Sequence, residues 1–321
     1  MGSLVGHVLP GIGFMLIGLW HLLNNIKLHA LHPTSYTSLT WFPTFKLRHL
    51  ELFLIMAGCL ASIAMELFVG PKRHHPFAPD GSIPYNHLHN FEHASISMTF
   101  FTYALLSLII DRVALPASRG VKQARHGLSL FLGAVAFSQE LLLFHLHSTD
   151  HSGPEGQFHM LLQLIILVSL ITTLLGIGFP NSLMVGFVRS LSIFFQGVRF
   201  IVIGVMLWTP AFVAKGCWMN YEEAHYVVRC DGEASLHRAK SLANLLFSYF
   251  VIGVAVFGVY FYLRLVKIYG ENDECFSLDS KADKAEKGTD DVESQKKTSI
   301  LSETHKSFIH DHVGGFELMP R

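Results

Sequence analysis

Seven windows of roughly 20 predominantly apolar residues constrain the fold of this chain more than any other feature. They cover about 4–25, 49–69, 92–113, 127–147, 158–179, 187–213 and 241–265. A run of this length crosses a bilayer as a helix, because hydrocarbon offers no other partners for backbone N–H and C=O groups. The sequence therefore predicts an all-α integral membrane protein, a multi-pass bundle of about seven transmembrane helices in the plasma membrane or the endomembrane system.

The end of the chain has a different composition. Charged residues make up 15% of the whole sequence, yet residues 271–321 hold 12 Asp and Glu against 7 Lys and Arg. A polar segment with few aromatic residues cannot bury enough apolar surface to offset the entropy lost on ordering. We expect a seven-helix domain over 1–268 and a disordered acidic cytosolic tail over 269–321 that binds cytosolic partners. Because no basic block is interleaved with aromatic residues, nucleic-acid binding is not expected.

The distribution of Lys and Arg between the loops predicts the orientation. Ten of these residues fall on one side of the predicted spans and six on the other. The side with more positive charge is usually cytosolic. This places the N-terminus in the lumen or outside the cell, and the C-terminus in the cytosol.

Two cysteines, Cys217 and Cys230, lie in the loop before the last span. The predicted orientation puts this loop on the oxidising side of the membrane, where a disulfide can form and persist. Two unrelated thiols are the alternative.

Histidine and glutamate side chains gather at one depth, near the lumenal ends of five predicted helices. They are His7, Glu66, His93, Glu140, His145, His147 and His159. Ionisable residues inside a membrane span usually pair with one another or line a polar cavity. The alternative is that each histidine at a helix end is an interfacial residue, solvated by lipid headgroups.

Histidine combined with carboxylate is a ligand set typical of zinc, and a catalytic zinc site has three protein ligands, a water and a nearby base. We therefore consider His7, His93, His145, His147 and His159 as metal ligands, with Glu140 or Glu66 as the catalytic base. Residues two apart on a helix point about 200° apart. His145 and His147 can share a site only if the helix ends near them.

A second polar set lies elsewhere in the spans. Gln196 and Arg199 fall at mid-depth, where a charge needs a partner, and Glu140 or Glu66 could neutralise Arg199. The cytosolic helix ends carry further histidines, namely His21, His49 and His126. Histidines at both faces of a bundle are also compatible with a bis-His haem carrier.

Several motifs resemble those of the transmembrane protein 45 family, also described as domain of unknown function 716, and most closely its plant branch. They are the opening MGSLVGHVLPGIGFMLIGLWH, the helix of Glu66, FEH at 91–93, QELLLFHLH from 139 and FFQG at 194–197. The resemblance covers about residues 1–268. It implies a multi-pass protein of about seven helices, and it carries no catalytic residues over to this chain.

Three functions remain open from the sequence. The first is a zinc-dependent membrane hydrolase that acts on a lipid substrate. The second is a proton-coupled transporter with Glu66, Glu140 and Arg199 as relay groups, which requires a polar path to both faces of the membrane. The third is a non-catalytic scaffold or trafficking protein, in which the His and Glu side chains only hold the bundle together.

Overall fold

The computed structural model describes residues 4–44, 46–70, 75–113, 118–148, 153–222 and 225–305. Its elements are α1 (Leu4–Leu31), α2 (Leu50–Ala64), η1 (Met65–Val69), η2 (Tyr85–His87), α3 (Leu88–Val113), α4 (Arg119–Ser148), α5 (Pro154–Gly178), α6 (Leu183–Trp208), η3 (Pro210–Phe212), β1 (Cys217–Glu222), β2 (His225–Cys230) and α7 (Gly232–His305). Seven helices in these residues are long and apolar enough to cross a membrane. The predicted all-α, multi-pass membrane protein is confirmed.

The helix boundaries depart from the apolar windows where local chemistry ends a helix. The sixth window predicts 187–213, whereas α6 spans Leu183–Trp208. Ser182 caps the start, because its side chain accepts a hydrogen bond from the backbone N–H of Val185. Pro210 follows the end, and proline cannot donate the backbone hydrogen bond that would continue the helix.

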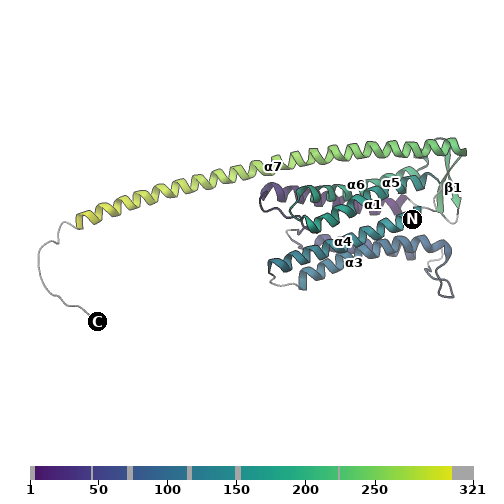
Figure 1. Ribbon diagram of the computed structural model, residues 1–321, viewed down its shortest axis with the longest axis horizontal. Coiled ribbons are helices and arrows are strands. Elements are labelled where there is room, and N and C mark those ends of the chain that lie inside the picture. Colours follow the sequence, from purple (N-terminus) through teal and green to yellow (C-terminus); the bar gives the residue numbers. More distant parts are fainter. Residues whose placement is uncertain are drawn as a thin grey trace. The chain divides into compact units, whose positions relative to one another are not determined.

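Six helices pack in a ring that follows the order α1, α6, α5, α4, α3, α2. Neighbours in this order contact one another, and α3 and α4 run side by side in Figure 1. The hydrogen bonds described between α1 and α2 join Trp20 and His21 to Glu51, at one end of the pair. In the described residues, hydrogen bonds therefore close the ring between α1 and α2 at that end.

Helices α1 and α6 approach one another through glycines spaced seven residues apart on each helix. A Cβ atom on Gly18 would lie 2.2 Å from the backbone nitrogen of Phe194, and one on Gly197 would lie 2.2 Å from that of Met15. No side chain fits at such separations. Small residues commonly allow this close packing between membrane helices, where the hydrophobic effect does not drive association.

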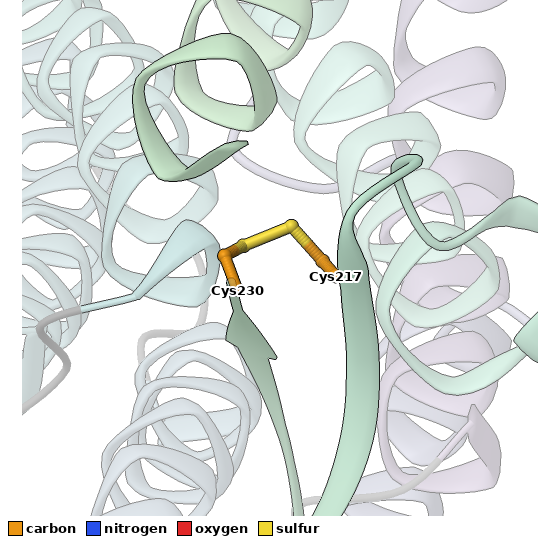
Figure 2. Close-up of a disulfide and its surroundings, with 2 residues drawn as sticks. All are labelled: Cys217 and Cys230. Carbon is orange, nitrogen blue, oxygen red and sulfur yellow. A yellow bond between two sulfur atoms is a disulfide. The ribbon is translucent and has the colours of Figure 1, made fainter. Parts of the chain in front are cut away.

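A two-stranded antiparallel hairpin, β1–β2, connects α6 to α7. Cys217 pairs with Cys230 in the register, and a disulfide joins the two (Figure 2). The indole nitrogen of Trp208 donates to the carbonyl of Tyr226 at 3.2 Å, which ties the hairpin to the end of α6. We call this end of the bundle the hairpin end, and the end that carries segment 32–49 the opposite end.

The chain divides into two compact units, Met1–Val266 and Lys267–Arg321. The division lies two residues from the predicted boundary between 268 and 269. Within the first unit, α7 packs on α6 through aromatic pairs such as Phe194 with Phe257, whose ring centroids are 5.1 Å apart. The backbone of α7 stays helical to His305, where the composition predicts irregular chain. Disorder of the tail stays a prediction, and 306–321 lie outside the described residues.

Candidate functional site

A cavity of about 1610 Å³ lies inside the ring of helices. Binding sites for small molecules usually measure roughly 300–1000 Å³, so this cavity is large enough for a lipid-sized ligand. Both His7 and His21 of α1 line it. Fourteen residues separate them, which corresponds to about 21 Å along a helix and thus to most of a roughly 30 Å hydrocarbon core.

The middle of the cavity wall is mostly apolar, with Glu140 as its one carboxylate among the described residues. Its side chains come from α1, α2, α3, α4 and α6, and include Phe14, Ile17, Ile55, Ile96, Phe100, Leu130, Phe137 and Ile193. Polar side chains lie mostly toward the two ends. An amphipathic molecule matches this distribution better than a fully polar one.

At the hairpin end, Glu66 is buried and faces α3. Its Oε2 accepts a hydrogen bond from Asn90 at 2.8 Å and lies 3.8 Å from Nδ1 of His93. The helix at Glu66 is a π-helix, in which the Gly70 N–H donates to the carbonyl of Met65. Such turns insert one extra residue and change the direction of the following side chains, and they are frequent at functional sites. Of the His and Glu residues predicted at the lumenal helix ends, the structure brings Glu66 and His93 together.

His7 lies at the same end in a separate aromatic group. Its ring stacks on Trp208 at a centroid distance of 4.4 Å and lies 5.8 Å from the ring of His159. The Nδ1 atom of His159 is 3.0 Å from the carbonyl oxygen of Glu155, so it donates to the backbone of its own helix. Both histidines are buried, and only His7 borders the cavity.

The metal site predicted from the sequence does not assemble in the described part of the chain. No group of three His, Cys, Asp or Glu residues there could hold a metal ion. His145 is exposed, with Nδ1 3.2 Å from the Gln163 side-chain oxygen. Because α4 stays helical to Ser148, the backbone keeps positions 145 and 147 about 200° apart. The side chain of His147 lies outside the described residues.

Glu140 lies at the centre of the bundle and borders the cavity. It is fully buried, and its Oε1 accepts a hydrogen bond of 2.5 Å from the amide of Gln196. Within the described residues, Glu140 Oε2 and Gln196 Oε1 have no hydrogen-bond partner. A buried carboxyl oxygen without a partner beside a cavity is a site for a proton or a polar ligand atom.

Arg199 does not form the predicted ion pair with Glu140 or Glu66. Its guanidinium lies between the rings of Phe158 and Phe247, at 5.6 and 5.2 Å from their centroids. None of its three side-chain nitrogens has a hydrogen-bond partner among the residues described. The side chain points toward α5 and α7, whereas Glu140 lies on α4. Aromatic faces therefore surround this cation in place of a carboxylate.

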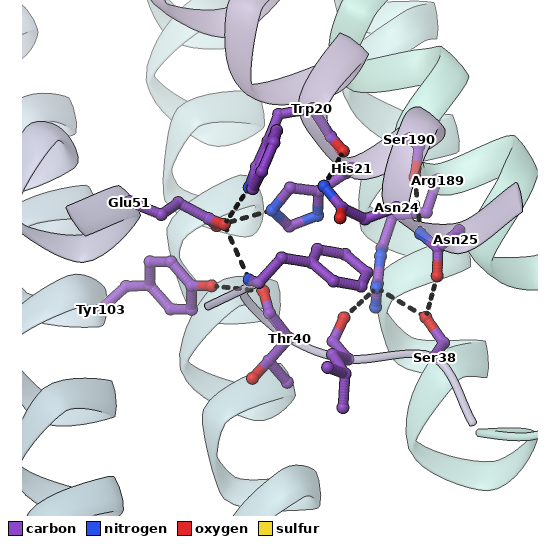
Figure 3. A network of polar contacts seen from close by, with 12 residues as sticks. Trp20, His21, Asn24, Asn25, Ser38, Thr40, Glu51, Tyr103, Arg189 and Ser190 are labelled. Atoms are coloured by element: carbon purple, nitrogen blue, oxygen red, sulfur yellow. Dashed lines mark hydrogen bonds and ion pairs between the residues drawn. The ribbon is translucent and has the colours of Figure 1, made fainter. Parts of the chain in front are cut away.

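A polar network closes the cavity at the opposite end (Figure 3). Glu51 accepts three hydrogen bonds, from Trp20 Nε1 at 3.1 Å, from His21 Nε2 at 2.6 Å and from the backbone N–H of Phe42 at 2.8 Å. Residue Phe42 belongs to the segment between α1 and α2, which folds back into the bundle and buries aromatic side chains. Thr40 of this segment borders the cavity, so we call this end of the cavity its floor.

Arg189 of α6 belongs to the same network and borders the cavity. Its Nη2 donates to Ser38 Oγ at 3.0 Å and to the carbonyl of Leu39 at 2.8 Å. Its Nη1 has no partner among the described residues, although the side chain is only 3% exposed. In the sequence, Arg189 is only one of the ten Lys and Arg residues counted on the predicted cytosolic side.

The histidines at the opposite end contact carboxylates. His21 Nε2 faces Glu51, and His49 Nε2 lies 2.8 Å from an oxygen of Asp111. Each contact involves one of the two ring nitrogens, and Nδ1 of His21 has no partner among the described residues. The haem hypothesis stays a prediction.

Residues 126–263 match the model of a family of unknown function, DUF716. Over this segment the chain is similar to the DUF716 family. The match covers most of α4, all of α5 and α6, the hairpin and the first part of α7. It contains Glu140, Arg189, Gln196 and the disulfide, and it agrees with the resemblance to the transmembrane protein 45 family. The closer resemblance to the plant branch stays a prediction.

Proposed function

We propose that this protein is a proton-coupled membrane carrier, which binds a small amphipathic molecule in the intramembrane cavity. One observation carries the proposal. The same cavity borders a Glu–His pair at each end, Glu66 with the half-buried His93 at the hairpin end and Glu51 with His21 at the opposite end. A carrier needs polar groups toward both faces of the membrane and a binding space between them.

Proton coupling has a structural basis in the same residues. Chains of Asp, Glu and His inside membrane proteins act as proton relays, and histidine is the side chain that most readily changes charge near neutral pH. Glu140 lies between the two ends and borders the cavity. The relay therefore runs through Glu66, Glu140 and Glu51. Arg199, which the sequence suggests as a relay group, lies outside the cavity lining.

Native Cys59 offers a test at mid-depth, because it borders the cavity. The Cys275→Ser variant is reconstituted in vesicles and treated with a membrane-impermeant thiol reagent from one face at a time. A carrier exposes the cavity to each face in turn, so Cys59 should be labelled from both. The variant that also carries Cys59→Ala is the control and should give no signal.

The outcome that contradicts a carrier is labelling of Cys59 from one face only, at all pH values tested. A protein with a fixed pocket would give that result. A loss of all labelling in folded protein would also contradict the proposal, since no aqueous access to the cavity would exist.

The zinc-dependent hydrolase is the competing proposal. It draws support from Glu66 with His93 and from the proximity of His7 to His159, and it needs further ligands from residues such as His147. Elemental analysis of the full chain purified without chelators separates the two. Less than about one tenth of an equivalent of any transition metal would exclude a resident catalytic zinc.

A scaffold or trafficking role remains the third proposal, in which the acidic tail recruits cytosolic partners. Replacement of Glu140 by Gln separates it from the others. Full retention of cellular function in Glu140→Gln would favour a scaffold, whereas a carrier that relays protons through this carboxyl group should lose proton-coupled transport.

A further inference from the structure

We propose that the ligand of the cavity is a long-chain monocarboxylate, whose carboxylate binds Arg189 and whose apolar chain extends toward the hairpin end. This inference rests on the proposed function only in placing the ligand in the same cavity. It adds the chemical class of the ligand, the residue that recognises its head group and the orientation in which it binds.

Nη1 of the Arg189 guanidinium, which has no partner among the described residues, indicates that the ligand is an anion. A buried arginine is costly unless its charge and its N–H groups are paired. Nη2 binds Ser38 and Leu39, both through neutral oxygens, and Nη1 has no partner in the part of the chain that the structure describes. None of the ion pairs found among these residues includes Arg189. An arginine in this state can accept a carboxylate from a ligand.

Glu51 is close enough to act on Arg189 through its charge, but no ion pair joins the two side chains in the described part of the chain. It lies on the same cavity floor, but its oxygens accept hydrogen bonds from Trp20, His21 and Phe42. The Glu51 carboxylate also limits the charge that the site can take. One arginine beside one carboxylate suits a monoanion better than a phosphate group, which carries about −1.5 to −2 charges at neutral pH.

Nη1 packs against Gly176, which has no side chain to displace it. It is 3.2 Å from the position that a Cβ atom on Gly176 would occupy, next to Leu130 of α4. Leu130 and its neighbour Ser129 both border the cavity. The free nitrogen therefore adjoins the cavity lining at the junction of α4, α5 and α6.

The remainder of the cavity suits an apolar chain. From Arg189 toward the hairpin end, the cavity wall includes Ile17, Ile55, Phe100 and Ile193, and it continues to the level of His7. A route from the lipid exists between α1 and α2. Leu9 of α1 and Leu54 of α2 both border the cavity, and they are 59% and 61% exposed. A membrane-dissolved fatty acid has direct access to this route.

Binding of labelled palmitate to the full chain in nanodiscs tests this proposal, with hexadecanol as a neutral ligand of the same chain length. Arg189→Gln removes the charge. Loss of a charge-assisted hydrogen bond should weaken palmitate binding about 10- to 100-fold. Hexadecanol binding should change by less than about threefold, because the apolar wall is intact.

Arg199→Gln is the matched control. It removes a second buried arginine from the same helix, ten residues away, which does not border the cavity. Palmitate affinity should stay within about threefold of the unmodified protein. Equal loss in both variants would overturn the proposal, as would palmitate affinity that is unchanged in Arg189→Gln, or absence of palmitate binding to the unmodified chain.

If Arg189→Gln fails to fold, the unmodified protein still decides the question. A palmitate analogue with a photoreactive group next to the carboxylate should crosslink to α4, α6 or segment 32–49. An analogue with the group at the far end of the chain should crosslink near Glu66 or the hairpin. The reverse pattern contradicts the proposed orientation. One-sided labelling of Cys59 together with Arg189-dependent palmitate binding would reject the carrier and retain the binding site.

Discussion

Gln196 donates a hydrogen bond to Glu140, and both side chains are fully buried. Outside a membrane, an exposed pair of this kind would contribute little, because water competes for both groups. Inside the bundle, removal of one partner leaves the other buried with fewer hydrogen bonds, and that is costly. Buried polar groups with partners on other helices are therefore expected to contribute strongly to the stability of the bundle.

Replacement of Gln196 by Ala should destabilise the bundle by about 1–3 kcal/mol, because Glu140 loses its described donor. Reversible unfolding in detergent micelles measures the change in free energy. Gln157→Ala is the control, since it removes an exposed hydrogen bond to Asn244 and should cost less than about 0.5 kcal/mol. Equal effects of the two substitutions would show that Gln196 does not stabilise Glu140.

At the scale of the elements, the contact between α1 and α6 depends on the absence of side chains. Gly18 and Gly197 allow backbone to meet backbone, and Gly11 and Gly204 repeat the pattern seven residues along each helix. The close approach also positions the cavity, because α1 and α6 carry His7, His21 and Arg189. Packing at these glycines therefore sets the lateral separation of α1 and α6, which form two walls of the cavity.

Gly197→Ala should destabilise the protein by about 1–3 kcal/mol, because the added methyl group overlaps the backbone of α1. The expected readout is a lower midpoint of thermal unfolding. Gly13→Ala is the matched control, since a Cβ atom there would meet nothing within 4 Å. That substitution should change stability by less than about 1 kcal/mol. A Gly13→Ala effect as large as that of Gly197→Ala would contradict this account of the interface.

At the scale of the whole molecule, the orientation in the membrane decides which end of the cavity faces the cytosol. The alternating helices put the disulfide hairpin and the segment around Asp80 on the same side. A disulfide persists on the oxidising side of a membrane, and the Lys and Arg distribution indicates the same side for the hairpin. We therefore expect Arg189 and Glu51 to lie toward the cytosol.

Single substitutions that create glycosylation acceptors test this orientation. Asp80→Asn creates the acceptor pattern with Ser82 at the hairpin end, and Pro33→Asn creates it with Ser35 at the opposite end. In a eukaryotic host, only the first variant should gain a glycan, because glycans are added on the lumenal side. A mass shift that disappears on enzymatic deglycosylation is the measurement. Glycosylation of the Pro33→Asn variant alone would show that the protein has the opposite orientation.

Hydrophobic length alone predicts the helices of this protein. Each apolar window corresponds to one helix, because a chain in hydrocarbon must satisfy its backbone hydrogen bonds within itself. Position along a helix can also be read from the sequence, and of the His and Glu residues predicted at the lumenal helix ends the structure brings Glu66 and His93 together. Direction around the helix axis is less predictable. The π-helix that begins at Met65 and the unbroken α4 at His145 both change which side chains face inward.

The sequence by itself determined the membrane character and the number of spans, because these follow from local composition and helix geometry. It did not determine a common level for the polar residues, since Glu140 lies at the centre of the bundle beside Gln196. Only the tertiary structure decided which residues share a site. Arg199 meets two aromatic rings in place of a carboxylate, and His145 lies outside the cavity lining. Arg189 and Glu51 join one network because segment 32–49 folds back between the helices. Such contacts depend on the rotation and packing of helices distant in sequence, which no local pattern specifies.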